Sequence, residues 1–441
     1  MGRRPVGIDL FAGAGGMSLG FEQAGFDVAT AIEIDPIHCA THMFNFPFTA
    51  VLPRSVVGLS ASDIRQAANL GDSEVDCVFG GPPCQGFSLI GQRSLDDPRN
   101  SLVREFIRLT CDLRARSFVF ENVKGLTLGT QRAFLVEFIE ECDRAGYDVV
   151  RPWQVLNASR FGVPQDRERL FLMGVRRGEE LPAYPLPTTS GRMVRSLMEF
   201  STPTCLDALG DLPDAERFET LRDSDEVECD FVGFRSAFAA GLRREADDDW
   251  GFGYRRVWKP NWLTSSARTE HSPISRRRFR ETLPGTIEPV SRFFRLARNG
   301  ISNTLRAGTD GSRGAFTSPR PIHFEHARCV TVREMARLHG YPDWFRFHAT
   351  KWHGARQVGN SVPPPLAQSV ASSVLASLGF RPDCPSQLVE LGDSSLLRVE
   401  MSQAAALLSV SVPVQRRDRK SGARKRSQLE VEASREALLR A

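Results

Sequence analysis

The 441-residue sequence contains no pair of cysteines with the spacing of a metal-binding or redox motif. Its nine cysteines are scattered at positions 39, 77, 84, 111, 142, 205, 229, 329 and 384. An odd, unpatterned set is typical of reduced thiols in a cytosol and argues against a disulfide framework. We therefore expect a cytoplasmic protein that has no disulfide scaffold and no metal site.

Long apolar runs are also missing. The segment AAALLSVSVPV near residue 410 is far shorter than the roughly 18 residues that would suggest a membrane span. At the other end, MGRRPVGIDLFAG passes directly from two arginines into an apolar strand pattern. We therefore expect neither a signal peptide nor a membrane segment.

Lysine is scarce, since it accounts for only five of the 57 basic residues. A GC-rich genome explains this arginine bias more simply than selection for binding, and the net charge of +4 is weak evidence about partners. Positive charge is concentrated in SRRRFRE (275–281) and QRRDRKSGARKR (415–426). Such charge runs are most often solvated surface.

What the sequence does contain is a regular first part. The length allows two or three domains, and the chain up to position 175 alternates between short apolar runs and segments of helical spacing. The strand patterns are VGIDLFA, VATAIEID, VDCVFGGPP and SFVFENV, and one predicted helical face carries Leu102, Phe106, Leu109 and Leu113. This alternation predicts an α/β fold with a doubly wound, mainly parallel sheet. Ligands of such sheets bind beyond the carboxyl ends of the strands.

From about residue 178 the sequence becomes irregular and rich in proline and arginine. We expect a second, smaller domain there rather than disorder, because Trp250, Trp258, Trp262, Phe293 and Phe294 supply apolar bulk. Helical patterns return within residues 329–347 and over residues 357–380. Beyond residue 380 the sequence drifts into a charged tail.

The segment DLFAGAGGMSLGF (9–21) follows a strand pattern and opens a helix, which is the context of a nucleotide-binding glycine turn. Glu33 ends the next strand pattern, where an acidic side chain binds ribose hydroxyls. The turn departs from GxGxxG and lacks basic partners for a pyrophosphate, so a nucleoside cofactor is favoured over a dinucleotide. Asp63 and Ile64 offer a carboxylate and an apolar wall for an adenine. The structural alternative is a tight packing turn.

The segment GGPPCQGFS (80–88) places one cysteine directly after two prolines, with glycines on both sides of this group. Each proline fixes its own backbone torsion, and glycine admits conformations closed to other residues, so Cys84 is presented at a defined place on a tight loop. A plain turn that carries a small core cysteine is the alternative.

Together, DLFAGAGGMSLGF, GGPPCQGFS, ENV, QDRER and QVGNSVPP resemble, in order and spacing, the motifs of the cytosine-5 DNA methyltransferase family. The resemblance covers roughly residues 5–178 and 320–380. It implies a Rossmann-like methyltransferase core with a smaller target-recognition domain, the cofactor S-adenosylmethionine, and duplex DNA as substrate. The implied divisions are a catalytic and cofactor-binding domain (1–178), a target-recognition domain (179–345), a segment completing the catalytic domain (346–380) and a charged tail that is a candidate for disorder (381–441).

The chemistry of the reaction gives the catalytic residues their roles. Carbon 5 of cytosine is a poor nucleophile until a nucleophile adds to carbon 6, and a thiolate such as that of Cys84 suits this step. Glu121 of FENV is the expected acid at ring nitrogen 3, although a carboxylate at a strand end can also be a simple cap. In QDRER, the resemblance implies that Arg169 touches the flipped-out base and Arg167 supports the site. A salt-bridged surface strand is the alternative for this segment.

The resemblance also implies further contacts. The target base must leave the duplex to be reached, and Gln85, Ser88 and Gln165 are the candidates for contact with DNA. Arg333 and Glu334 resemble the helix that supports the target domain, a structural role. The cofactor-binding residues carried over are Phe11, Gly13, Gly15, Glu33, Ile34, Asp63, Ile64, Pro83, Leu102, Asn360 and Ser361.

Three other functions compete with this interpretation. A tRNA cytosine-5 methyltransferase of the same fold keeps the chemistry but changes the substrate, whereas the length of the recognition region favours DNA. A catalytically silent DNA- or cofactor-binding regulator would have lost Cys84, Glu121 or part of QDRER. A nicotinamide dehydrogenase leaves Cys84 and QVGNSVPP unexplained. We expect a monomer in a bacterial, nucleoid-associated setting, and a separate restriction endonuclease is a candidate counterpart.

Overall fold

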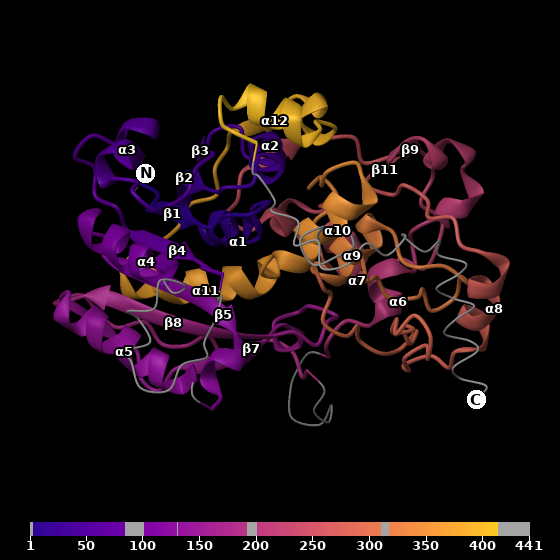
Figure 1. Ribbon diagram of the computed structural model, residues 1–441, viewed down its shortest axis with the longest axis horizontal. Coiled ribbons are helices and arrows are strands. Elements are labelled where there is room, and N and C mark those ends of the chain that lie inside the picture. The colour runs from indigo at the N-terminus through magenta and orange to yellow at the C-terminus, as the bar shows by residue number, and fades with distance from the viewer. Residues whose placement is uncertain (1–2, 84–100, 130, 192–200, 310–316, 413–441) are drawn as a thin grey trace, which may run out of the picture.

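The computed structural model describes residues 3–83, 101–129, 131–191, 201–309 and 317–412. Its centre is an eight-stranded sheet with the order β3-β2-β1-β4-β5-β8-β6, in which β7 also pairs with β8 (Figure 1). The strands β1 to β5 are parallel to one another, and β8 runs antiparallel to β5, β6 and β7. The predicted doubly wound, mainly parallel sheet is therefore confirmed. The strands are β1 Val6–Leu10, β2 Asp27–Ile32, β3 Ala50–Leu52, β4 Cys77–Gly80, β5 Ser117–Val123, β6 Tyr147–Val149, β7 Gln154–Asn157 and β8 Glu168–Arg176.

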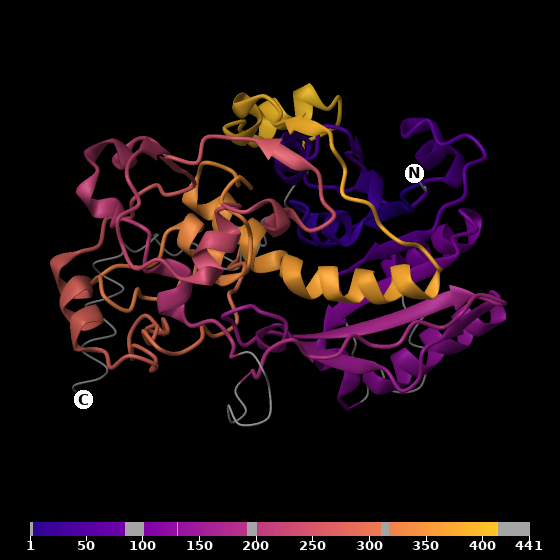
Figure 2. The same cartoon turned by 180° about the vertical axis from the view of Figure 1, so that it is seen from behind.

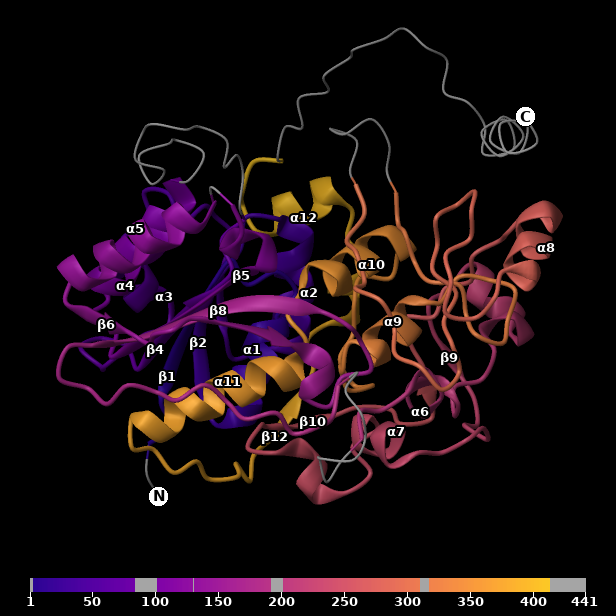
Figure 3. The ribbon, with the colours of Figure 1, turned by 90° about the horizontal axis from the view of Figure 1, so that it is seen from below.

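Helices cover both faces of the sheet because its central strands are apolar on both sides. In β5, Phe118 and Phe120 join the core under α4 and α5, whereas Val119 between them joins the core under α1 and α11. Figure 3 shows these two helical layers on opposite sides of the sheet. The helices that complete this part are α1 Gly16–Ala24, α2 Pro36–Asn45, α3 Ala61–Ala67, α4 Ser101–Asp112, α5 Gln131–Arg144, α10 Lys351–Asn360 and α11 Pro364–Ser377.

A late segment of the chain completes the first layer. Helix α11 packs along α1, although the two helices lie towards opposite ends of the sequence (Figure 2). A Cβ on Gly20 would lie 2.5 Å from the Cβ of Ala367, so the two backbones approach as closely as this glycine permits. The single helix predicted over residues 357–380 is wrong in one respect: α10 ends at Asn360 and α11 begins at Pro364, because the prolines at 363–365 interrupt the helical hydrogen bonds.

The part of the chain between β8 and α10, here called the region beside α10, contains short elements and several ion pairs. Its apolar core joins Trp344, Phe345 and Phe347 to α6, α9 and α10. Figure 1 shows this region beside the sheet, next to α10. Its elements are α6 Cys205–Leu209, α7 Ala237–Leu242, α8 Pro273–Glu281, α9 Val332–Leu338, β9 Val227–Glu228, β10 Arg255–Val257 and β11 Trp262–Leu263.

The segment that follows α11 differs from the expected tail. Residues 381–412 contain β12 (Leu388–Glu390), which pairs with β10, and α12 (Met401–Leu407), which contacts α2. The Gly392 amide also donates to the Phe44 carbonyl, 2.8 Å away. Apolar residues such as Val389 and Ala404, both fully buried, explain why this part packs on the body of the protein. No helix in the described ranges is long and apolar enough to cross a membrane.

Candidate active site

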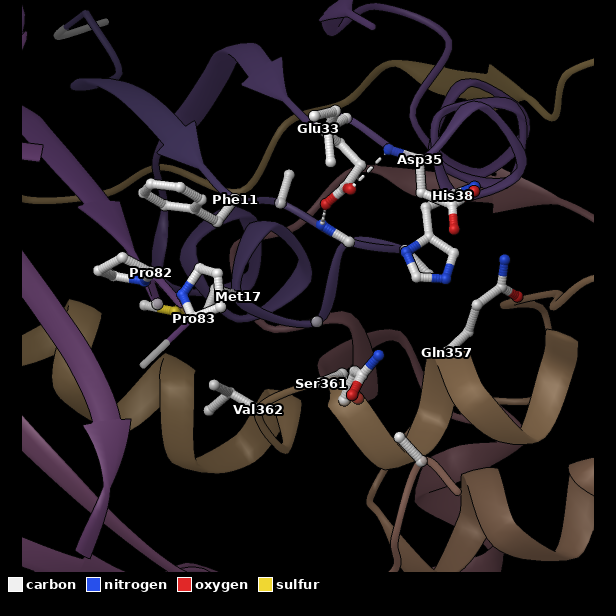
Figure 4. A pocket seen from close by; sticks show the side chains of 18 of the residues that line it. Phe11, Met17, Glu33, Asp35, His38, Pro82, Pro83, Gln357, Ser361 and Val362 are labelled. Carbon is white, nitrogen blue, oxygen red and sulfur yellow. Dashed lines mark hydrogen bonds between the residues drawn. The ribbon is translucent and has the colours of Figure 1, made fainter. Parts of the chain in front are cut away.

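A large cavity opens at the carboxyl ends of the parallel strands, where ligands of doubly wound sheets bind. Its volume is about 1140 Å³, which exceeds the usual range for one small ligand and leaves room for two. Asp9 reaches it from β1 and Glu121 from β5, and Phe11 and Glu33 directly follow β1 and β2. The turn between α10 and α11 closes the opposite wall with Ser361 and Val362 (Figure 4).

Glu33 is fixed at the rim of this cavity by two backbone donors. Its Oε2 accepts from the Gly13 amide at 2.8 Å, and its Oε1 accepts from the Asp35 amide at 2.9 Å (Figure 4). The glycine turn supplies the first donor because Gly13 has a φ of +56°, a conformation that favours glycine. The carboxylate is thus held between the two segments expected to bind a nucleoside.

Most of the predicted cofactor residues line the cavity. Gly15 does not, because its φ of +99° serves packing: a Cβ there would lie 2.4 Å from the Phe46 ring and 3.1 Å from the His42 ring. The predicted cofactor residues that line the cavity are Phe11, Gly13, Glu33, Ile34, Pro83, Leu102, Asn360 and Ser361.

Asp63 and Ile64 are not brought to the cavity, contrary to the prediction. Asp63 is half-buried and forms a reciprocal capping box with Ser60 at the start of α3, with its Oδ2 accepting from the Ser60 amide at 3.0 Å. Ile64 is fully buried in the core between the sheet and α4. The motif Ser-x-x-Asp is also a helix-start signal, and that signal explains these positions.

Glu121 and Arg169 both line the cavity and lie in contact with each other. In the antiparallel ladder of β5 and β8, Arg169 lies opposite Val123, so it is a diagonal neighbour of Glu121 on the same face. Arg169 Nε lies 2.9 Å from Glu121 Oε1. Burial raises the pKa of the Glu121 carboxyl, and the two cations Arg169 and Arg167 oppose this rise. Glu121 is therefore a carboxyl placed to hold a proton.

The glycines before the Pro-Pro sequence have a packing cause. A Cβ on Gly80 would lie 1.9 Å from the Leu10 carbonyl oxygen, and a Cβ on Gly81 would lie 2.3 Å from Glu121 Oε2. Asn122 Nδ2 donates to the Pro82 carbonyl at 3.0 Å. The end of β4 is thus held against Glu121, so that Pro82 and Pro83 line the cavity.

Gln165 and Arg167 are internal supports. Gln165 is fully buried, and its amide contacts the Leu338 carbonyl, His339 Nδ1 and the Leu305 amide. The predicted DNA contact of Gln165 is therefore wrong for this structure, because buried neighbours already occupy its polar atoms.

Arg167 is also buried, with 1% of its surface exposed. It donates to the carbonyls of Leu305, Gly359 and Ser361 at 2.8–2.9 Å. It does not line the cavity, and this excludes the salt-bridged surface strand as an explanation for its place in QDRER. Arg169, two residues later, does line the cavity.

Three predicted residues, Cys84, Gln85 and Ser88, lie outside the described residues. Arg333 and Glu334 are buried on α9. Arg333 donates to Thr264 Oγ1 at 2.7 Å, and Glu334 pairs with Arg328 at 2.8 Å. These contacts match the structural role predicted for both.

Sequence reasoning missed Asp9, which lines the cavity although its side chain is almost fully buried. An acidic residue within an otherwise apolar, buried strand was the available signal, because a carboxyl is rarely buried without a partner.

The sheet order and the cavity at its carboxyl edge define an α/β protein with the Rossmann-like methyltransferase fold. Residues 6–376 match the family model of the C-5 cytosine-specific DNA methylases. The chain is 56% identical over 411 residues to Type II methyltransferase M.XorII of Xanthomonas oryzae pv. oryzae, covering 93% of this chain and 94% of that protein. It is 33% identical over 373 residues to Type II methyltransferase M1.HphI of Haemophilus parahaemolyticus, covering 83% and 86%.

Among solved structures, a prophage-encoded DNA modification methyltransferase from E. coli is similar, with a TM-score of 0.69 and 32% identity. That match covers 85% of this chain and all of the other. The chain belongs to the C-5 cytosine-specific DNA methylase family. The predicted activity, methylation of carbon 5 of cytosine in DNA, is thereby confirmed over the tRNA alternative.

Proposed function

We propose that this chain transfers the methyl group of S-adenosylmethionine to a cytosine swung out of duplex DNA, through a covalent adduct with Cys84. The observation that carries the proposal is the Glu121–Arg169 pair, which lies at the cavity beside Pro82 and Pro83. These prolines directly precede Cys84 in the sequence. A thiol nucleophile and a proton-holding carboxyl are the two groups that activation of a cytosine ring requires.

The cavity residues fit the proposed cofactor. Ile34 is an apolar side chain with 63% of its surface exposed, and with Phe11 it offers apolar surface for an adenine. Glu33 presents a fixed carboxylate for ribose hydroxyls. At Gly16 a Cβ would lie 2.6 Å from both Tyr341 Oη and the Val362 carbonyl oxygen. Only glycine therefore lets the start of α1 approach these two groups so closely.

The chain's own groups divide the work of the reaction. When bound, S-adenosylmethionine supplies a methyl group activated by a positively charged sulfur. Cys84 adds to carbon 6, and Glu121 holds the proton that ring nitrogen 3 takes up as electron density moves toward it. Arg169 fixes the Glu121 carboxyl and faces the base. Arg167 acts through the backbone that it holds, joining Leu305 to the turn at Gly359–Ser361.

The biological setting extends this proposal. The Type II names of the two relatives favour a role beside a separate restriction endonuclease. Residues 179–345 are the proposed target-recognition domain, and residues 346–380 are proposed to complete the cofactor site. The residues proposed to bind the cofactor and those proposed to act on the base line one cavity of a single chain, so we propose a monomer.

The test measures transfer of labelled methyl from S-adenosylmethionine to duplex DNA and to RNA, followed by trapping on a duplex that carries 5-fluorocytosine. We expect label in DNA alone and a covalent complex through Cys84, because fluorine at carbon 5 blocks the proton loss that precedes release. Cys84→Ser should abolish trapping, whereas Cys384→Ser, at an exposed cysteine, should leave it intact. Trapping that persists in Cys84→Ser, or label in RNA, would contradict the proposal.

A further inference from the structure

Residues 381–412, here called the anchored segment, are attached to the protein although the match to the family model ends at residue 376. The Ala349 amide donates to the Leu397 carbonyl at 2.8 Å, and the Gly392 amide donates to the Phe44 carbonyl at the same distance. A Cβ on Gly392 would lie 2.8 Å from Phe44 Cα, so a larger residue would push the segment away from α2. The anchored segment therefore has a fixed place on the protein.

An ion-pair cluster adds a second attachment. Arg398 Nη2 lies 3.2 Å from Asp225 Oδ1 and 2.9 Å from Glu226 Oε1. Arg346 pairs with the same two carboxylates. Helix α12 contacts α2, and β12 pairs with β10. The anchored segment is thus joined both to a helix beside the sheet and to the region beside α10.

The anchored segment ends on the cavity side of the molecule. Helix α2, which α12 contacts, begins at Pro36, and Asp35 directly before it lines the cavity. Figure 3 shows α12 on the side towards which the parallel strands point. The cavity lies at the carboxyl ends of those strands. A duplex that presents a base to the cavity therefore lies on the side where the anchored segment ends.

The charge of the chain is divided unevenly at the end of this segment. Residues 413–441, which lie outside the described residues, contain nine basic and four acidic residues. They contribute +5 to the net charge of +4, so residues 1–412 have a net charge of −1. Neutralisation of phosphates by arginine and lysine supplies essentially all of the sequence-independent affinity for DNA. Residues 1–412 provide no excess of positive charge for this purpose.

The basic run QRRDRKSGARKR (415–426) follows the anchored segment almost at once, since only Pro413 and Val414 lie between them. The run contains seven basic residues and one acidic residue. Three residue steps reach at most about 10 Å, and twelve residues reach at most about 40 Å. The second length is roughly one helical turn of DNA. The cations of the run are therefore within reach of a duplex on the cavity side.

We propose that the anchored segment holds the basic run beside the substrate duplex, where its cations bind phosphates that flank the target base. The inference concerns binding rather than methyl transfer, and it rests on the proposed function only because duplex DNA is the substrate. A short tether keeps the cations at a high local concentration near the duplex. This explains the firm attachment of the segment, because a tail that is merely solvated gains nothing from being ordered up to its first charge.

The experiment measures binding of a labelled duplex of about 30 base pairs between about 0.05 and 0.2 M salt. In the triple variant Arg416→Gln, Arg417→Gln and Arg419→Gln, the slope of log affinity against log salt should become shallower by about 2 to 3, since each lost phosphate contact removes about 0.9. Methyl transfer to genomic DNA from a host without this enzyme should show a KM for DNA that is higher by about tenfold or more. The kcat and the affinity for the product S-adenosylhomocysteine should not change, because the run does not touch the reacting atoms.

The matched control removes the same charge from the opposite edge of the sheet. Arg114, Arg144 and Arg177 are exposed there, close in sequence to the start of β5, the end of α5 and the end of β8. The triple variant Arg114→Gln, Arg144→Gln and Arg177→Gln should leave the salt slope unchanged and the KM for DNA within about twofold of wild type, because these positions are distant from the bound duplex.

Two further variants test the attachment and keep every charge of the basic run. Gly392→Val places a branched side chain against α2, and Arg398→Met removes the ion pairs with Asp225 and Glu226. Each should raise the KM for DNA by about threefold or more, because the tether becomes longer. Arg398→Lys, which keeps a cation at this point, should remain close to wild type. If Gly392→Val does not fold, as judged by thermal unfolding, the two Arg398 variants decide.

An unchanged salt slope in the triple variant of the basic run, or an equal change in the control, would overturn the proposal. A wild-type KM for DNA in both Gly392→Val and Arg398→Met would also overturn it, since the attachment would then have no part in binding. If the wild-type protein binds the duplex but transfers no methyl group, the proposed function fails, and the salt slope still decides on the basic run.

Discussion

Buried charges are treated differently in the two halves of the molecule. In the region beside α10, Arg337 pairs with both Asp211 and Asp343. At the sheet edge, Glu121 has one cationic partner in direct contact among the described residues, and burial raises its pKa. Removing one partner of a fully paired buried charge destabilises the fold, whereas a buried cavity carboxyl whose pKa is raised marks a candidate site for chemistry.

In the region beside α10, buried arginine side chains compensate for the small amount of regular secondary structure. Helices α6, α7 and α9 have five to seven residues, and β9 and β11 form a sheet with two residues in each strand. Short elements leave many backbone groups outside ladders, so side chains must satisfy them. Arg333 does this when it donates to the carbonyls of Thr264, Pro342 and Phe345.

The largest effect expected from this comparison is on catalysis. Glu121→Gln keeps the size of the side chain but removes the proton-holding carboxyl, so methyl transfer should fall by about 10²–10⁴-fold. Single-turnover transfer to duplex DNA measures this loss. Glu168→Gln is the control, because Glu168 is on the same strand as Arg169 but forms an exposed pair with Lys124. Activity of Glu121→Gln within tenfold of wild type would mean that Glu121 is a strand-end cap.

The next effect is on stability. Arg337→Met leaves Asp211 and Asp343 buried without their shared cation, so the free energy of unfolding should fall by about 3–5 kcal/mol. Urea unfolding followed by fluorescence measures the change. Arg277→Met, at an arginine with 59% of its side chain exposed, should stay within about 0.5 kcal/mol of wild type. Equal effects from the two substitutions would remove the distinction between the regions.

The stability contributed by a buried carboxyl should also change with pH in opposite directions in the two regions. Arg328 helps to lower the pKa of Glu334 to about 2, so the stability contributed by Glu334 is present above its ordinary pKa of 4.5 and is lost as pH falls from 4.5 toward 2. The pKa of Glu121 is raised, so its contribution is present below its ordinary pKa and is lost as pH rises through the folded value.

Urea midpoints measured between pH 3 and pH 8 test this contrast. Relative to wild type, Glu334→Gln should lose more stability at pH 7 than at pH 3. Glu121→Gln should instead gain stability at pH 7. The idea of two classes of buried carboxyl is wrong if both variants shift in the same direction at both pH values.

The sequence predicted the sheet half well, because its strands are buried on both faces and are punctuated by glycine turns. Every strand pattern noted between residues 6 and 123 corresponds to an observed strand. Glu33 and Glu121 could also be placed, since residues that end parallel strands meet at one edge of the sheet.

What could not be predicted depends on contacts between distant segments. The burial of Gln165 follows from Leu305, Leu338 and His339, all of which lie far from it in the sequence. The packed strand and helix after residue 380 follow from pairing with β10 and from contact with α2. Local composition carries no record of such partners, so a charged tail was the simplest interpretation of that segment.

The smallest effect is expected at Asp63, where sequence and structure disagree. The resemblance places Asp63 beside the adenine, whereas the structure uses its carboxylate to cap α3 through Ser60. Asp63→Asn should therefore leave the affinity for S-adenosylhomocysteine within about twofold of wild type, because a helix cap that does not line the cavity does not alter the contacts of the ligand. Glu33→Gln is the comparison: its carboxylate accepts from two backbone amides at the cavity rim, so the loss of charge should weaken binding by about tenfold or more. Equal weakening by the two substitutions would show that Asp63 moves to the adenine when the ligand binds, and the capped α3 would then describe the ligand-free state alone.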